Sequence, residues 1–170
     1  MILQSLWQSI ENSSLSQSIA SSEVAFPLIE TFHVFAVVTV IGTIAIMDLR
    51  LLGLTSRKWT ASSISRDTLW LTWLAFLVAV ITGLLMFVSK AATYMVNPWF
   101  LVKMAMLAAA GINMAVLHRG PWRAIASWDS ALAVPGSVRL SAALSLTFWI
   151  VVIFCGRFIG FTLGVYQPPL

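Results

Sequence analysis

Charged residues are scarce in this sequence, making up 9% of its 170 residues, whereas hydrophobic residues make up 59%. An average soluble domain is about 25% charged. A soluble chain of this composition would expose large apolar patches, so soluble proteins are excluded as a class. The chain is therefore an integral membrane protein with the lipid bilayer as its first partner. The net charge of +4 has a topological explanation, so nucleic acid is not predicted as a partner.

Residues for several common chemistries are also missing. The single cysteine, Cys155, excludes an intrachain disulfide framework and a cysteine cluster for zinc or iron and sulfur. The spacing of Glu30 and His33 matches half of a di-iron carboxylate site, but the later apolar stretches contain no acid to complete it. Phosphate-loop, dinucleotide and nucleophile motifs are absent as well. No catalytic residue is predicted, and whether the protein is an enzyme stays open.

Four long apolar stretches dominate the sequence. They cover about residues 28–48, 69–89, 99–118 and 140–163, within a membrane domain of residues 27–164. Roughly 20 helical residues cross the apolar part of a bilayer, and only helices satisfy their own backbone there. Short connections make sequential helices antiparallel. The predicted fold is all-α, an integral membrane antiparallel four-helix bundle.

The segments outside this domain are short. Residues 1–26 begin with an apolar stripe, Leu3, Leu6, Trp7 and Ile10, which predicts a short interfacial helix. Docking of this helix against the bundle or a partner is the rival interpretation, because its polar face carries no Lys or Arg. A Ser-rich stretch at 13–22 is predicted to be a flexible connection, and residues 165–170 form a short tail.

The distribution of cations predicts the orientation. Seven lie in the first and third connections, whereas Lys90 is the loop cation of the other side: Arg50, Arg57, Lys58, Arg66, Arg119, Arg123 and Arg139. Cytoplasmic loops carry the excess of Lys and Arg. The protein is therefore predicted in a bacterial inner membrane, crossing it several times, with both termini on the non-cytoplasmic side.

A group of ionisable residues is expected in the outer half of the bundle: Glu30, His33, Lys103 and Arg157. Such groups are costly in lipid unless paired or hydrated, which makes them candidates for a functional site. The rival interpretation is that Lys103 and Arg157 extend to the membrane surface and that Glu30 neutralises one of them.

Two histidines in a membrane bundle also suggest haem b. His33 and His118 lie roughly 20 Å apart along the membrane normal, so one iron cannot bind both. His33 would be the metal ligand, Lys103 and Arg157 would neutralise propionates, and the second axial ligand would be one of three methionines: Met86, Met104 and Met106.

Other polar and small residues have structural interpretations. Residues at the inner edge are Asp48, Arg50, Asn113, His118 and Arg119. We expect an ion pair of Asp48 with Arg119 or Arg139, and a hydrogen bond of Asn113 to a neighbouring helix. Small residues predict close helix packing, within the bundle rather than between protomers: Gly42, Gly111, Gly156, Gly160 and Gly164.

Three motifs carry a resemblance that covers about residues 27–163. They are IETFHVFAVVTVIGTIAIMDLRLLG, NPWFLVKMAMLAAAGINMAVLH and FWIVVIFCGRFIGF. Together they resemble a family of small, mostly uncharacterised bacterial four-helix inner-membrane proteins. More remotely, His33 and the Gly156-Arg157 pair are similar to features of copper-resistance D proteins and four-helix b-type cytochromes. This second resemblance implies haem or copper.

Three functions stay open on this evidence. The first is an outer-half site that binds a redox cofactor or small ligand, with b-type haem for electron transfer as its concrete form. The second is a non-catalytic accessory subunit, whose partner is another membrane protein or a second copy of the chain. The third is a proton or small-solute transporter that uses Glu30 and His33 as a relay.

Overall fold

A computed structural model describes residues 2–55, 58–129 and 134–166, with the side chains of residues 2 and 3 left out. These ranges are helical and contain no strand. The helices long and apolar enough to cross a membrane are α3 (Ala25–Leu51), α4 (Ala61–Ser89), α6 (Pro98–Arg119) and α8 (Gly136–Thr162). The predicted all-α fold with four membrane helices is confirmed. Arg57 and residues 167–170 of the predicted tail lie outside the described residues.

The helices end where local sequence signals stop them. At the end of α3, Gly53 has a φ of 77°, and the N–H groups of Gly53 and Leu54 donate to the carbonyls of Arg50 and Leu49. This is a Schellman ending, which favours glycine at the left-handed position. At the start of α6, the Asn97 side chain accepts from the N–H of Trp99, and Pro98 occupies the first turn.

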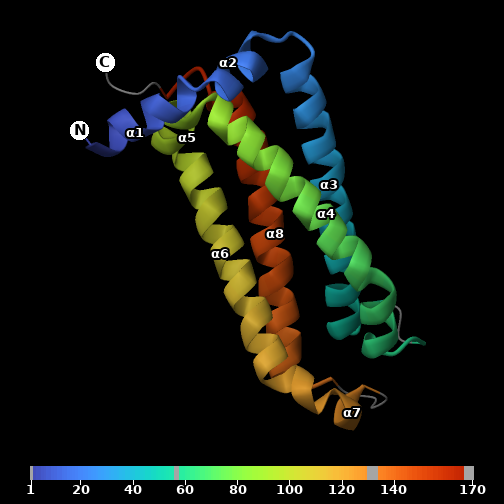
Figure 1. Ribbon diagram of the computed structural model, residues 1–170. Coiled ribbons are helices and arrows are strands. Elements are labelled where there is room, and N and C mark those ends of the chain that lie inside the picture. The colour runs from blue at the N-terminus through green and yellow to red at the C-terminus, as the bar shows by residue number, and fades with distance from the viewer. Residues whose placement is uncertain (1, 56–57, 130–133, 167–170) are drawn as a thin grey trace.

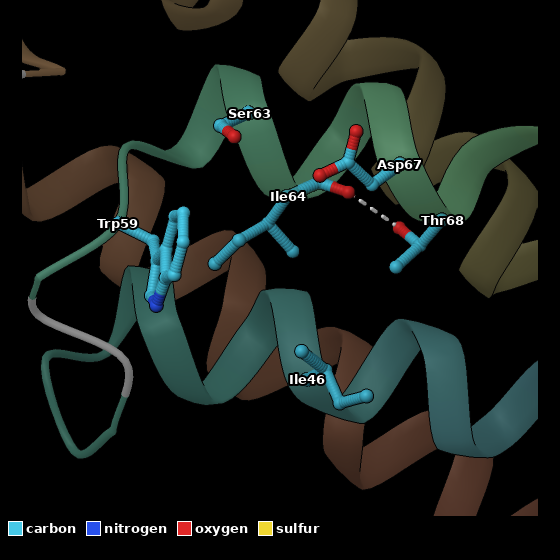
Figure 2. Close-up of a pocket in the computed structure, with 6 residues that line it drawn as sticks. All are labelled: Ile46, Trp59, Ser63, Ile64, Asp67 and Thr68. Carbon is cyan, nitrogen blue, oxygen red and sulfur yellow. Dashed lines mark hydrogen bonds between the residues drawn. The ribbon is translucent and has the colours of Figure 1, made fainter.

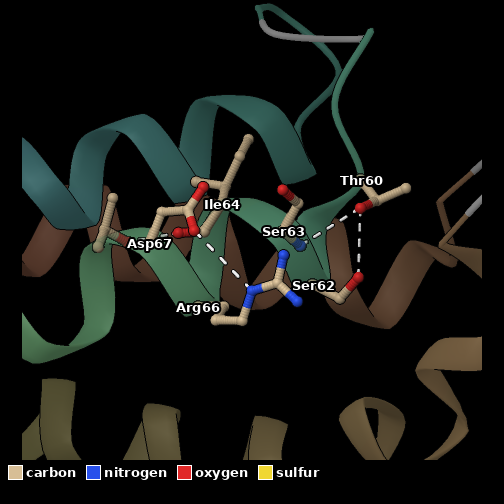
Figure 3. Close-up of polar contacts among 7 residues, drawn as sticks. Thr60, Ser62, Ser63, Ile64, Arg66 and Asp67 are labelled. Atoms are coloured by element: carbon tan, nitrogen blue, oxygen red, sulfur yellow. Dashed lines mark hydrogen bonds and ion pairs between the residues drawn. The ribbon is translucent and has the colours of Figure 1, made fainter.

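Helix α4 begins well before the predicted residue 69. The Thr60 hydroxyl caps its first turn by accepting from the N–H of Ser63, and its oxygen lies 3.2 Å from the Ser62 hydroxyl oxygen (Figure 3). The predicted stretch 69–89 covers only the part of α4 that is apolar enough for lipid. The helix itself continues through a polar segment that the apolar count omitted.

The four long helices pack as two pairs. Helix α3 packs along α4 and α6 packs along α8, and the contact of α3 with α8 joins the pairs (Figure 1). Helix α8 is central, because 33% of its most apolar 18-residue stretch is buried. The corresponding stretch of the third span, which includes α6, is 6% buried. Consecutive helices α4 and α6 are linked through the short α5 (Ala91–Val96) rather than through an extensive contact of their own. The bundle is therefore less closed than sequential antiparallel packing predicts.

One end of the bundle, the α5 end, is covered by the N-terminal helices α1 (Ile2–Glu11) and α2 (Ser14–Ser21) (Figure 1). The Trp7 ring lies edge-on to Phe87 of α4 with centroids 5.9 Å apart, and the Glu11 carboxylate accepts from the N–H of Ala92 in α5 at 3.0 Å. The N-terminal helix therefore docks against the bundle, and its position at the membrane interface stays a prediction.

The Ser-rich stretch differs from its prediction as a flexible connection. Residues Ser14–Ser21 form α2, whose first turn is capped by the Ser13 hydroxyl accepting from the N–H of Ser16. Ile19 is 6% exposed, and α2 packs on α3 and α4. Serine lowers helix propensity only modestly, so a cap and one buried apolar side chain are enough to order the segment.

The opposite end, the α7 end, holds the 3₁₀ helix η1 (Pro121–Ala124) and α7 (Ile125–Trp128). Here Leu51, Ala61, Val138, Ala142 and Trp128 form the main buried apolar cluster. Asp129 follows α7 and accepts from the backbone N–H groups of Ala61 and Ser62, at 2.6 and 3.2 Å. Its carboxylate thus caps the start of α4 and fixes α7 beneath the bundle.

Candidate functional site

His33 lies in the contact between α3 and α4. Its Nδ1 is 3.0 Å from the hydroxyl oxygen of Thr82, and that hydroxyl lies 2.7 Å from the Val78 carbonyl one turn earlier in α4. Because the Thr82 proton is used on Val78, the Thr82 oxygen accepts and His33 Nδ1 donates. In the neutral imidazole, Nε2 then carries the lone pair, and the backbone of Ala79 also lies within hydrogen-bonding reach of the ring.

Gly83 makes room for this imidazole. A Cβ built at Gly83 would lie 3.1 Å from Cε1 of His33, a distance that forces the neighbour to move. Sequence reasoning passed over both Thr82 and Gly83. The signal was present, since the pair interrupts a run of bulky apolar residues in α4.

Lys103 projects from α6 toward α8. Its Nζ lies 3.9 Å from a Cβ built at Gly156, and its ammonium is close enough to His33 and Cys155 to act on both electrostatically. Lys103 is roughly 8 Å and Gly156 roughly 9 Å from the α5 end, at 1.5 Å per residue. The ammonium therefore reaches sideways, at its own depth, rather than extending to the membrane surface.

These residues come from all four long helices. His33, Thr82, Lys103 and Cys155 lie at similar depths, roughly 8–12 Å from the α5 end. Together with Gly83 and Gly156 they form what we call the polar centre. Lys103 forms no ion pair within the described residues. The ion pair found there joins the exposed side chains of Arg66 and Asp67, 3.9 Å apart. The polar centre thus holds an amine that no carboxylate of the described residues pairs with, together with an imidazole on which that amine acts electrostatically.

The other residues predicted for this site do not join the polar centre. Glu30 is exposed on α3, and its charge acts on Tyr94 in α5. Arg157 is exposed, with its guanidinium carbon 4.4 Å from the centroid of the Phe161 ring. Met104 is 49% exposed, whereas Met86 and Met106 are half-buried. Among the described residues no group of three or more His, Cys, Asp or Glu is placed to hold a metal ion.

The inner-edge residues near the α7 end mostly have ordinary partners. Asn113 donates to the Ser141 carbonyl at 2.9 Å and accepts from the Ser141 hydroxyl at 3.0 Å, which joins α6 to α8. Arg50 is 8% exposed, and its Nε donates to the Trp59 carbonyl at 2.7 Å. His118 is exposed; its Nδ1 lies 2.9 Å from the Met114 carbonyl.

The predicted ion pair of Asp48 with Arg119 or Arg139 does not form. Both arginines are exposed, whereas Asp48 is 6% exposed and faces Ser145 of α8. The two arginines lie at exposed helix ends. Asp48 lies inside the α3–α8 contact and does not reach them.

The glycines also differ from their predicted role. A Cβ built at Gly42, Gly111, Gly160 or Gly164 would meet nothing within 4 Å. Close packing within the chain therefore does not explain these four. Gly156 alone of the predicted set has a near neighbour, Lys103.

A surface hollow of about 240 Å³ lies between α3 and α4 near the α7 end, lined by Ile46, Trp59, Ser63, Ile64, Asp67 and Thr68 (Figure 2). Asp67 is the charged residue of this lining, and its carboxylate pairs with Arg66. Trp59 is 64% exposed at the rim. The hollow opens to the surface and holds no uncompensated group, so it is the weaker candidate site.

The fold and this polar centre define a multi-pass membrane protein with four spanning helices. The chain belongs to the family of unknown function DUF6644, whose sequence profile matches residues 20–162. No curated protein and no solved structure matches the chain. The predicted membership of an uncharacterised family is confirmed. The remoter resemblance to copper-resistance D proteins and b-type cytochromes stays a prediction, as do the compartment and the orientation of the termini.

Proposed function

We propose that this protein binds a small ligand or cofactor carrying an anionic group at the polar centre. The observation that carries the proposal is Lys103, whose ammonium lies between α6 and α8 without a carboxylate partner among the described residues. A charge inside a membrane bundle is costly unless it is paired. A carboxylate or phosphate of a bound molecule supplies the missing charge.

His33 adds a second requirement on the ligand. With Nδ1–H directed to Thr82, its Nε2 offers a lone pair to a metal or to a hydrogen-bond donor. Metal-bound histidines usually donate their other N–H to a protein acceptor, which fixes the ring. Haem b meets both requirements, because its iron suits Nε2 and a propionate suits Lys103. A haem at this position would serve electron transfer.

The residue that would hold the iron together with His33 is the open part of the haem proposal. Met86 and Met106 are the half-buried thioethers, whereas the exposure of Met104 argues against it. Arg157 and Glu30 lie on the surface around the site rather than within it.

Optical absorbance of the purified protein, expressed with adequate haem, tests this proposal. We expect a Soret band that His33→Ala abolishes. We expect Lys103→Met to lower the affinity for haem roughly tenfold, which corresponds to about 1.4 kcal/mol. Lys90→Met is the matched control, because Lys90 is an exposed lysine at the same end of the bundle.

Two results would contradict the haem form. One is the absence of a Soret band together with the absence of iron in the purified protein. The other is a band of equal strength in wild type and His33→Ala.

An accessory subunit is the second candidate function. It is favoured by the face of α6 that carries Ala108 and Gly111, which is exposed, with open space at Gly111. Small residues on a membrane helix allow another helix to approach closely. Co-purification of a specific membrane protein that Gly111→Leu removes, with absorbance unaffected by His33→Ala, would favour this function over ligand binding.

A further inference from the structure

Asp48 is a buried carboxyl group that the polar centre does not use. It lies on α3 near the α7 end and is 6% exposed. The Ser145 side chain of α8 is within hydrogen-bonding reach of the carboxyl group, but Oδ2 has no hydrogen-bond partner. Asp48 therefore lies in the α3–α8 contact that joins the two helix pairs.

No cation in the described part of the chain neutralises Asp48. Arg50, two positions along α3, directs its Nε to the Trp59 carbonyl. The other ionisable groups on the packed elements are exposed or engaged elsewhere: Arg66 and Asp67 of α4, His118 and Arg119 of α6, Asp129 after α7, and Arg139 of α8. Within the described residues, an ionised Asp48 would thus be an isolated buried anion.

The surroundings of Asp48 are apolar. Its helical neighbour Leu51 is 1% exposed and belongs to the buried cluster with Val138 and Ala142 of α8. Burying an unpaired charge costs far more than burying a neutral polar group. A metal cation would need several oxygen ligands around it, whereas a proton needs one.

We propose that Asp48 is a proton-binding site, present as a neutral carboxylic acid at neutral pH with the proton on Oδ2. The proton comes from water at the α7 end and returns there when the group ionises. Ionisation would place an uncompensated anion between α3 and α8 and weaken the contact that joins the helix pairs. The contact between α3 and α8 therefore has two states, a stronger one with Asp48 protonated and a weaker one with Asp48 ionised.

Labelling with a hydrophobic carbodiimide tests the proposal, because this reagent reacts with protonated carboxyl groups and not with carboxylates. The full-length protein in detergent is treated over a range of pH, and the modified position is found by mass spectrometry. We expect an adduct on Asp48 at neutral pH that falls at least tenfold at high pH. The exposed Asp67, paired with Arg66, is the internal control and should remain unlabelled.

Infrared spectra of the same samples give an independent readout. We expect the carbonyl stretch of a protonated carboxylic acid at neutral pH, lost in Asp48→Asn and retained in Asp67→Asn. If Asp48→Asn does not fold, Ser145→Ala replaces it, and removal of the hydroxyl should shift the position of the band.

Three results would overturn the proposal. They are the absence of label on Asp48 at neutral pH, the absence of the carboxylic acid band, and labelling that sodium ions suppress at constant pH. The last result would assign the site to a metal cation instead.

Discussion

The two halves of the bundle treat their polar residues differently. Toward the α7 end most polar side chains have partners, with Asp48 as the exception: Asn113 bonds to Ser141, Arg50 to the Trp59 carbonyl, and Asp129 to the start of α4. Toward the α5 end, Lys103 has no carboxylate partner among the described residues, and it acts electrostatically on His33. Polar groups that satisfy one another have a structural explanation. Those left uncompensated at a shared depth indicate a site for something outside the chain.

The largest expected effect on stability comes from the satisfied half. Asp129→Ala removes the acceptor for the N–H groups of Ala61 and Ser62 and for the Ser62 hydroxyl. We expect a loss of about 1–2 kcal/mol, typical of a helix cap, measured as thermal unfolding in detergent. Asp67→Ala is the control, because its exposed ion pair should contribute close to nothing. Equal losses in the two variants would contradict the capping role.

Two glycines sharpen the comparison between a functional and a neutral position. Gly111→Ala meets open space and should stabilise α6 by about 0.5–1 kcal/mol through helix propensity. Gly83→Ala gains the same propensity but displaces the His33 ring, so we expect no net gain and weaker ligand binding. Thermal unfolding and absorbance measure the two effects. If both variants gain stability and binding is unchanged, Gly83 does not position His33.

A smaller loss is expected for the link between α6 and α8. Asn113→Ala removes two hydrogen bonds with Ser141, and such bonds between membrane helices average about 0.6 kcal/mol. Ligand binding at the polar centre should be unchanged, since Asn113 lies toward the other end. A loss of binding without a loss of stability would show that the two halves are coupled.

The pKa of Tyr94 predicts a change in stability that is confined to high pH. Burial, together with the nearby charge of Glu30, raises the pKa of Tyr94 to about 12. An unfolded tyrosine ionises near pH ~10, so the folded protein holds an extra proton between pH ~10 and ~12. Stability should therefore fall as pH rises through that window, and less so in Tyr94→Phe. Unfolding measured across this range, in a Tyr166→Phe background, would contradict the prediction if both proteins responded alike.

The architecture was predictable because lipid restricts a spanning chain to helices, and four apolar stretches of sufficient length are explicit in the sequence. Counting residues along each helix also predicted that His33 and Lys103 lie at a similar depth and that His118 lies far from both. Which face of each helix points inward was not predictable, because these helices are apolar all round. That is why Arg157 and Met104 were grouped with His33, although they lie on the surface.

The missed residues have a similar explanation. Thr82 and Gly83 matter only because α3 packs along α4 at that level, which is a property of the fold rather than of either stretch. Small residues predicted close packing within the chain, but a small residue does not fix which side of its helix has a neighbour, and Gly42, Gly111 and Gly160 meet open space. The predicted ion pair of Asp48 with Arg119 or Arg139 rests on their shared position at the inner edge, whereas the fold directs Asp48 to Ser145.

Native mass spectrometry of the purified protein tests the central claim most directly, because it needs no assumption about the ligand. Wild type, Lys103→Met and Lys90→Met would be released from detergent under the same conditions and their bound small molecules compared. The polar centre as a ligand site predicts a bound anionic molecule in wild type and Lys90→Met that is lost or strongly reduced in Lys103→Met. The same bound mass in all three proteins, or none in any of them, would contradict it.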